Sequence, residues 1–367
     1  MCFLLERFVV ILALVAAIGC GSKRPPAFFS NPLPLLTWLG EFTRPAGTLY
    51  PQLNDSAKYG SLSGLAPDQA RKQWIGVIDD RNQARVAWLT IDFAPGRFEV
   101  LPVRMQELRP GAGTESRRVT EADLESIVAL SNGTFVLGEE GHVRDRGVWQ
   151  PALLQMTADG LVTNVIEFPK EFQITGDGKT GLRDNQGFEG LAVTPSGRLI
   201  AGLEQPLFQD GAVTFDRGAP GRLIEFEKSG STFRPGRQWR YMLSPTKRVE
   251  GFDEVCSDGE NGLVELLAFS DTTLLSMERA CLVSKDKFIA VTVQLFAVEL
   301  VGSEARKRLL LDFDSITSRL SSALSRLENF EAMTFGPVVN GTRTLLIASD
   351  DNFRATQKTS FLLFGMR

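Results

Sequence analysis

The sequence predicts an all-β fold, a β-propeller of four-stranded blades. Two observations indicate this fold. Four segments repeat one pattern of carboxylate, apolar strand, turn, apolar strand and carboxylate, and further strands follow each segment. A repeated unit of four antiparallel strands is the content of one propeller blade. The four segments are residues 123–140, 187–204, 264–279 and 329–351.

A fifth, degenerate copy spans residues 62–80, with Ser63-Gly64 in place of the first acid and Asp79-Asp80 at its end. In chain order, a second strand pair follows each of the first four of these five hairpins, beginning with the degenerate copy. These pairs are at residues 85–104, 151–168, 222–241 and 288–311. The last repeat has only three strands, so a strand within residues 35–42 is expected to close the ring. We count five blades, and a sixth within residues 207–262 remains open.

The turns of these hairpins fix which acids face each other. Asn132-Gly133 and Asn340-Gly341 are strong hairpin signals, because both residue types accept the positive φ of tight turns. Residues equidistant from a turn lie opposite each other, about 4.5–5.5 Å apart, where like charges are destabilising. The acids placed in this way are Glu125 with Glu139, Glu189 with Glu204, Glu265 with Glu278, and Glu331 with Asp350. Such pairs require a cation, a ligand or an arginine. The pairing could slip by one residue at Glu139-Glu140 and at Asp350-Asp351.

Little helix is expected. Residues 314–328 place apolar side chains on one helical face, with Asp314 as the N-cap. This segment is predicted to pack as a helix on the face of the ring.

The N-terminus predicts export. Residues 8–18 are an apolar run too short to span a bilayer, which is typical of a signal peptide. Residues 17–20 (AIGC) resemble a lipobox, so we expect cleavage before Cys20 and lipidation of Cys20. An ordinary secretory signal with an incidental cysteine is the alternative. The predicted division is a signal peptide at 1–19, the lipidated cysteine with a Pro-rich tether and closing strand at 20–45, and the propeller at 46–367. The expected location is a bacterial membrane, the outer membrane facing the periplasm or the surface.

An oxidising compartment makes a disulfide between Cys256 and Cys281 plausible, the alternative being two buried free thiols. The net charge of −4 provides no basic stripe and argues against nucleic acid as a partner. The one histidine, His142, weakens mechanisms that need a histidine base, and we expect it on a solvated loop rather than in a catalytic role. A G-x-S-x-G elbow and phosphate-binding loops are absent from the sequence.

Three motifs resemble the phytase-like family, often described as "esterase-like activity of phytase". They are N-x-G-F-E-G at 185–190, E-R at 278–279 and S-D-D-N-F at 349–353, and the resemblance extends over residues 46–367. The resemblance implies a β-propeller and hydrolysis of phosphate esters or similar esters. The positions that match the family pattern are Glu125, Glu189, Glu204, Glu278, Arg279, Glu331, Asp350, Asp351 and Asn352. The Ser63-Gly64 pair departs from it and leaves the ring of acids open on that side.

The acidic hairpin ends are expected to converge at the channel mouth and hold a divalent cation, Ca²⁺ or else Mg²⁺, because these ions prefer carboxylate and amide oxygens. The predicted ligands are Glu125, Glu139, Glu331, Asp350, Asp351 and Asn352, and the predicted catalytic residues are Glu189, Glu204, Glu278 and Arg279. Arg279 either clamps a phosphate or pairs with Glu278. The leading hypothesis is a metal-dependent hydrolase of a small (phospho)ester that contacts a membrane through its lipid anchor only. The alternatives are structural latches between blades, a non-catalytic binding propeller and a lactonase-like propeller.

Overall fold

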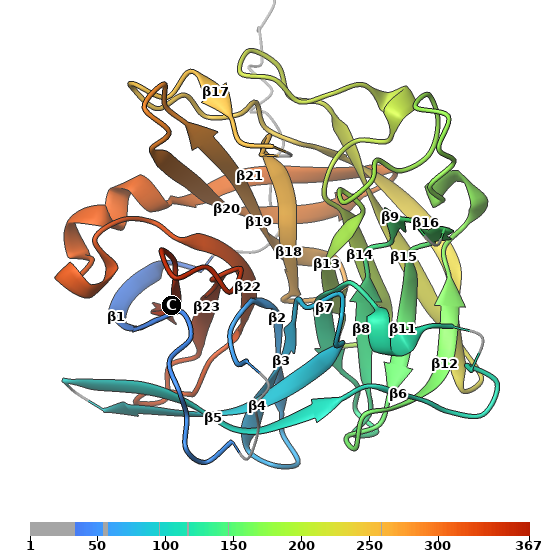
Figure 1. Ribbon diagram of the computed structural model, residues 1–367, viewed down its shortest axis with the longest axis horizontal. Helices are drawn as coiled ribbons and strands as arrows, with labels where there is room; N and C mark the ends of the chain where they lie inside the picture. The colour runs from blue at the N-terminus through green and yellow to red at the C-terminus, as the bar shows by residue number, and fades with distance from the viewer. Residues whose placement is uncertain (1–33, 54–57, 95, 116, 146, 258) are drawn as a thin grey trace, which may run out of the picture. The chain divides into compact units, whose positions relative to one another are not determined.

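Five blades of four antiparallel strands make up the described part of the chain, whose innermost strands lie at the centre of Figure 1. The computed structural model describes residues 34–53, 58–94, 96–115, 117–145, 147–257 and 259–367. The predicted signal peptide, the lipidated Cys20 and the tether up to residue 33 lie outside these residues. In the part described, no helix is long and apolar enough to cross a membrane.

The blades are numbered here along the chain, each from its innermost strand outwards. Blade 1 is β2 (Leu62–Asp68), β3 (Gln73–Ile78), β4 (Arg85–Ala94) and β5 (Arg97–Glu107). Blade 2 is β7 (Leu124–Ala129), β8 (Phe135–Glu139), β11 (Ala152–Met156) and β12 (Leu161–Glu167). Blade 3 is β13 (Phe188–Val193), β14 (Leu199–Leu203), β15 (Pro220–Ser229) and β16 (Thr232–Met242). Blade 4 is β18 (Gly262–Ala268), β19 (Thr273–Val283), β20 (Ile289–Val301) and β21 (Glu304–Asp312).

Blade 5 combines the two ends of the described chain. Its strands are β22 (Asn329–Phe335), β23 (Thr344–Asp350), β24 (Lys358–Met366) and β1 (Leu36–Pro45). Strand β1 pairs antiparallel with β24, which confirms the predicted N-terminal fourth strand. The innermost strands contact one another in cyclic order, β2 with β7, β7 with β13, β13 with β18, β18 with β22, and β22 with β2.

The remaining elements are short. They are β6 (Arg109–Pro110) beside β12, the hairpin β9 (His142–Arg144) and β10 (Gly147–Trp149), β17 (Glu254–Val255) beside β19, and the 3₁₀-helices η1 (Val119–Glu121), η2 (Lys170–Phe172), η3 (Phe208–Asp210), η4 (Phe313–Arg319) and η5 (Ser322–Leu324). The segment in which a sixth blade was considered supplies β15, β16, η3 and β17 instead, so the described residues form five blades.

The core lies between the blades, which explains why the inner strands are apolar on both faces. All residues of β8 and β14 are buried. Between blades 1 and 2, Trp88 and Val77 share one cluster with Ile127 and Leu137. Residues that face a neighbouring blade on either side of a strand must be apolar on both sides, so these strands do not show simple alternation. The tight turns have the predicted chemistry, since Asn340 and Gly341 both have positive φ.

The predicted helix at residues 314–328 is wrong: the chain forms two separate 3₁₀-helices there, η4 and η5. Asp312, not Asp314, caps η4 by accepting a hydrogen bond from the Asp314 backbone N–H. Ser321 accepts a hydrogen bond from the Ala323 N–H, and its own N–H donates to Glu41 of β1 at 3.0 Å. Side chains that bond the backbone locally compete with an α-helix, and this segment is rich in serine.

Candidate functional site

Every innermost strand carries a β-bulge near its start. In each blade the register against the second strand shifts by one residue at this point. The extra residues, blade by blade, are Ser63, Glu125, Glu189, Val264 and Glu331. A bulge re-aims a side chain without ending the strand. Three of the five blades use this device to place a glutamate.

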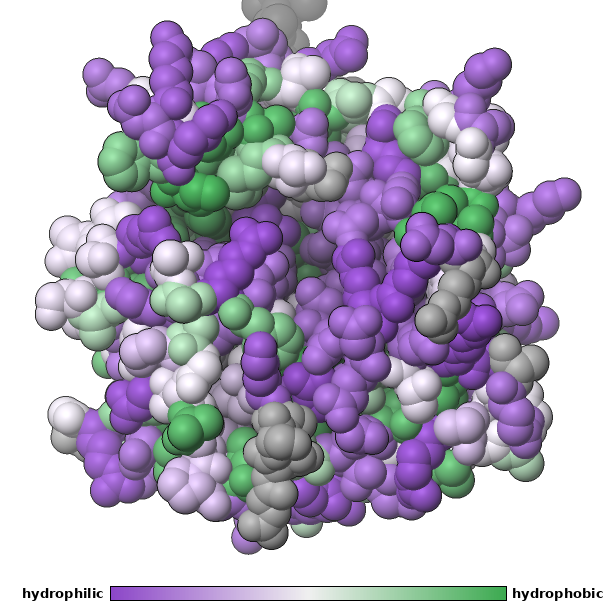
Figure 2. Space-filling model, in the orientation of Figure 1, coloured by the Kyte–Doolittle hydropathy of each residue, from purple (hydrophilic) through white to green (hydrophobic). Residues whose placement is uncertain are grey.

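A second set of equivalent residues belongs to the second strand of each blade or directly follows it. Each comes one residue after the second-strand residue that pairs with the innermost strand just before the bulge. These residues are Asp79, Glu140, Glu204, Arg279 and Asp350. All five line one cavity of about 410 Å³, together with the bulged Glu125, Glu189 and Glu331. We call it the channel cavity. Hydrophilic residues predominate around the middle of the face drawn in Figure 2.

The bulge corrects the predicted pairing in blade 2. Glu139 lies opposite Leu124 rather than Glu125, because the bulge displaces the register by one residue. Glu139 is 1% exposed and accepts hydrogen bonds from Arg117, with Nη2 at 2.6 Å and Nε at 3.1 Å. The neighbouring Glu140 takes its place in the channel cavity.

The third hairpin turns both of its predicted acids away from the channel cavity. Glu278 is fully buried and accepts hydrogen bonds from the Tyr241 hydroxyl and the Asn261 amide, each at 2.7 Å. Lys307 also pairs with it. Glu265 accepts hydrogen bonds from the backbone of Leu191 in blade 3 and of Leu266. These two acids act as latches, because the bulged residue of this blade is Val264 and the next cavity position is Arg279.

The S-D-D-N-F motif divides its residues between two tasks. Asp350 and Asn352 line the channel cavity. Asp351 is fully buried and accepts hydrogen bonds from the Ser61 and Phe353 backbone N–H groups, each at 3.0 Å. Asp350 accepts one from the Ser61 hydroxyl at 2.7 Å. The motif therefore joins blade 5 to the chain entering blade 1, while one carboxylate and one amide face the channel.

Two groups of three carboxylates have ligand oxygens within 4.8 Å of one another. They are Asp79, Asp123 and Glu125, and Glu140, Glu189 and Glu204. Sets of carboxylate oxygens suit hard cations such as Ca²⁺ and Mg²⁺. The second group fits an ion, because Glu189 Oε2 is buried and has no hydrogen-bond partner in the described part of the chain. Of the predicted ligands, only Glu125 belongs to either group; Glu331 instead pairs with Arg279, Nη2 to Oε1 at 2.9 Å.

Burial and mutual repulsion shape the electrostatics of the channel cavity. Burial raises the pKa of Glu331 and of Asp350 to about 7. Burial and the nearby Asp123 raise the pKa of Asp79 to about 8. Desolvation also raises the pKa values of Glu125, Glu140 and Glu189 well above their usual range, and neighbouring carboxylates add to the effect. For Arg279, burial acts to lower the pKa, but Glu331 and Glu189 outweigh it and raise the value. Carboxylates with such pKa values serve as proton donors and acceptors near neutral pH.

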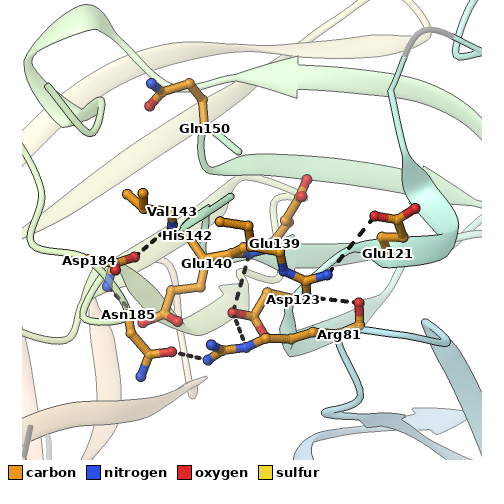
Figure 3. Close-up of polar contacts among 12 residues, drawn as sticks. Arg81, Glu121, Asp123, Glu139, Glu140, His142, Val143, Gln150, Asp184 and Asn185 are labelled. Atoms are coloured by element: carbon orange, nitrogen blue, oxygen red, sulfur yellow. Dashed lines mark hydrogen bonds and ion pairs between the residues drawn. The ribbon is translucent and has the colours of Figure 1, made fainter. Parts of the chain in front are cut away.

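The sequence did not predict the polar cluster at the blade 1 side of the cavity. Arg81 Nε lies 2.8 Å from Asp123 Oδ2, and its guanidinium also donates to Asn185 (Figure 3). His142 is not on a solvated loop as expected: it is 1% exposed in β9, stacks on Trp149 with ring centroids 5.1 Å apart, and places Nδ1 3.6 Å from Asp123. Asp79 and Asp123 were visible as ends of repeats, but no sequence signal connected Arg81 to them.

A disulfide joins Cys256 to Cys281, with Cα atoms 5.4 Å apart, which decides between the two alternatives that the sequence left open. Both cysteines line the channel cavity. The bond ties the segment around β17 to β19, two residues beyond Arg279.

Comparison with known proteins gives a family for this chain. Residues 57–353 match the phytase-like family described as "Esterase-like activity of phytase", and the chain belongs to this family. No curated protein sequence matches the chain significantly.

Solved structures with low sequence identity resemble the fold. An endo-arabinase from Bacteroides thetaiotaomicron is 11% identical, with a TM-score of 0.45 and 89% of this chain and 97% of that chain covered. A mannose phosphorylase from Leishmania mexicana is 10% identical, with a TM-score of 0.40 and 85% of each chain covered. A calcium structure of a Trichoderma reesei carbohydrate-active enzyme is 13% identical, with a TM-score of 0.39 and 84% of this chain and 82% of that chain covered.

Proposed function

We propose that the protein is a hydrolase that binds a divalent cation through Glu140, Glu189 and Glu204 and cleaves a phosphate ester or a related ester in the channel cavity. The observation that carries the proposal is the convergence of these three carboxylates beside Arg279, with Glu189 Oε2 buried and unpaired. Membership of the phytase-like family supports ester hydrolysis as the reaction class. Ca²⁺ or Mg²⁺ suits the three oxygen donors.

The residues of the chain divide the work between binding and proton transfer. A bound cation would polarise the phosphoryl or carbonyl oxygen and lower the pKa of a water molecule. Arg279 is held by Glu331, while its buried Nε has no hydrogen-bond partner in the described residues. That N–H is available to an anionic substrate oxygen. Glu331 and Asp350, each with a pKa near 7, are suited to donate a proton to the leaving oxygen or to accept one from water.

The test is hydrolysis of p-nitrophenyl phosphate, phytate and short acyl esters by the purified protein, with and without EDTA. We expect turnover that EDTA abolishes, that added Ca²⁺ or Mg²⁺ restores, and that Glu189→Gln lowers at least about 100-fold. Glu139→Gln is the matched control, since this buried neighbour of Glu140 faces Arg117 outside the cavity. Turnover indifferent to both EDTA and Glu189→Gln would refute the metal mechanism. A cation-loaded protein inactive on every substrate would favour a non-catalytic binding propeller.

We also propose that the chain is exported and anchored to a bacterial membrane through a lipid on Cys20. The lipobox-like AIGC sequence supports the anchor, and the Cys256–Cys281 disulfide is typical of an oxidising compartment. Fractionation of cells expressing Cys20→Ala tests this: the wild-type protein should be in the membrane fraction, and the variant should not be lipidated.

A further inference from the structure

Three seams around the channel cavity share one arrangement. At each of them the cavity residue on the second strand of one blade lies close to the bulged residue of the next blade. Between blades 4 and 5 these residues are Arg279 and Glu331, which form an ion pair. Between blades 1 and 2 they are Asp79 and Glu125, and both are acids within one carboxylate group. The position that holds the Arg279 guanidinium at the seam between blades 4 and 5 therefore holds the Asp79 carboxyl group at the seam between blades 1 and 2.

The seam between blades 1 and 2 brings together more acidic side chains than basic ones. Asp123 adds a third carboxylate to Asp79 and Glu125. Arg81 lies 2.8 Å from Asp123 and supplies one positive charge. When all three acids are ionised, three carboxylates face one guanidinium, and one divalent cation would balance the two remaining negative charges. Buried carboxylates without a counter-charge are strongly unfavourable.

An independent observation at this seam points to a missing ligand. Asp123 is fully buried, and its Oδ1 accepts no hydrogen bond within the described residues. Its Oδ2 faces Arg81 and His142 (Figure 3), and Asp79 lies close enough to share a hydrogen bond with the same carboxyl group when one of the two is protonated. Buried polar atoms are almost always satisfied in folded proteins, and an unfilled ion position is one of the few explanations for an exception.

We propose that Asp79, Asp123 and Glu125 bind a second divalent cation, of the hard class of Ca²⁺ or Mg²⁺, which joins blade 1 to blade 2. Asp79 follows β3 of blade 1, and Asp123 and Glu125 begin the innermost strand of blade 2. The ion would therefore bridge the two blades at the channel, in addition to their apolar packing, the Arg81–Asp123 ion pair and peripheral hydrogen bonds such as that from Arg104 to the Ala158 carbonyl oxygen. This inference does not depend on the proposed hydrolysis, because it concerns cation binding alone.

Terbium is a probe of this second site, since a Tb³⁺ ion luminesces when a nearby tryptophan transfers its excitation. Trp149 stacks on His142, which lies 3.6 Å from Asp123. Glu125 and Glu189 are equivalent bulged residues in adjacent blades, so Glu125→Gln and Glu189→Gln form a matched pair of variants. We expect tryptophan-excited Tb³⁺ luminescence in the full chain, its loss in Glu125→Gln and Trp149→Phe, and its retention in Glu189→Gln.

Calorimetric titration with Ca²⁺ or Mg²⁺ gives the second readout. We expect two ions per chain, falling to one in each glutamine variant and to none in the double variant. Asp79→Asn, which alters the same site from the other blade, serves if Glu125→Gln does not fold. Two ions retained in both folded Glu125→Gln and Asp79→Asn, or one ion in the wild type that only Glu189→Gln removes, would overturn the inference. A single ion that only Glu189→Gln removes would leave the proposed function intact. Two bound ions without any hydrolysis would instead support this inference and contradict the proposed function.

Discussion

Arg279 of β19 and Glu331 of β22 form an ion pair across the seam between blades 4 and 5, Nη2 to Oε1 at 2.9 Å. The pair occupies the same relative positions as the carboxylates at the seams between blades 1 and 2 and between blades 2 and 3. Arg279 is thus the one basic residue among the five cavity residues of the second strands. The channel cavity therefore has an acidic side and a side on which the arginine balances carboxylate charge.

The ion pair predicts a specific coupling between its members. Arg279→Gln leaves Glu331 buried without its partner, and we expect it to lower the free energy of unfolding by about 3 kcal/mol, as is typical of such half-removed pairs. Glu331→Gln introduced into that variant should recover most of the loss. Urea unfolding of the four proteins in a double-mutant cycle measures the coupling. Additive losses would show that the two side chains do not stabilise each other.

The raised carboxyl pKa values predict how the cation-free protein responds to pH. Glu331 and Asp350 shift from ordinary values of 4.5 and 3.8 to about 7 through burial. A carboxyl with a raised folded pKa binds its proton more tightly in the folded state, so its stabilising contribution is complete below the unfolded pKa and is lost as pH rises through the folded value. In EDTA, the free energy of unfolding should therefore fall between about pH 4 and about pH 8.

Two comparisons check that pH dependence. Glu331→Gln should make the fall shallower, because one titrating group is removed. Exposed Asp216→Asn, at a surface ion pair with Arg248, should leave it unchanged. A stability that rises between about pH 5 and about pH 8 in EDTA would contradict the assignment of buried, proton-binding carboxyls.

The repeats predicted the blades well because each blade is a local unit of hairpins, and hairpin turns have distinctive residues such as Asn340-Gly341. The fourth strand of blade 5 was also predictable, since the last repeat lacked one. The two 3₁₀-helices that replace the predicted helix were not predictable, because apolar spacing alone gives no information on serine side chains, such as Ser321, that hydrogen-bond to the backbone.

The site was predicted less completely, for a geometric reason. Mirror placement about a turn assumes an unbroken ladder, whereas every innermost strand contains a bulge. In blade 2 this error exchanges Glu140 for Glu139, and in blade 4 it assigns Glu278 to a cavity that Arg279 lines. Residues such as Arg81 and Asp123 meet only when adjacent blades pack, so no spacing within one repeat reveals them.

The contrast between Glu278 and Arg279 separates a latch from a cavity residue. Glu278→Ala removes the acceptor shared by Tyr241, Asn261 and Lys307, so we expect a loss of about 3 kcal/mol in the free energy of unfolding. Cation stoichiometry and turnover per folded molecule should stay unchanged, because Glu278 does not line the channel cavity. Arg279→Gln should instead raise the KM for an anionic ester. Impaired cation binding in folded Glu278→Ala would show that the latch also supports the site.

Close packing of the innermost strands predicts that blade separation controls cation affinity. A Cβ added at Gly64 of β2 would lie 2.8 Å from Ser126 Cα and 3.0 Å from the Glu125 carbonyl oxygen. Gly64→Ala should therefore cost about 1–3 kcal/mol through overpacking and push β7 away from blade 1. Moving Glu125 away from Asp79 should weaken Tb³⁺ binding at the seam, with less effect on the ion at Glu189. Gly40→Ala in β1 is the matched control, because its nearest atoms are 3.9 Å from the added Cβ. If Gly64→Ala binds Tb³⁺ as tightly as the wild type, the two carboxylates do not depend on strand spacing for their shared ion.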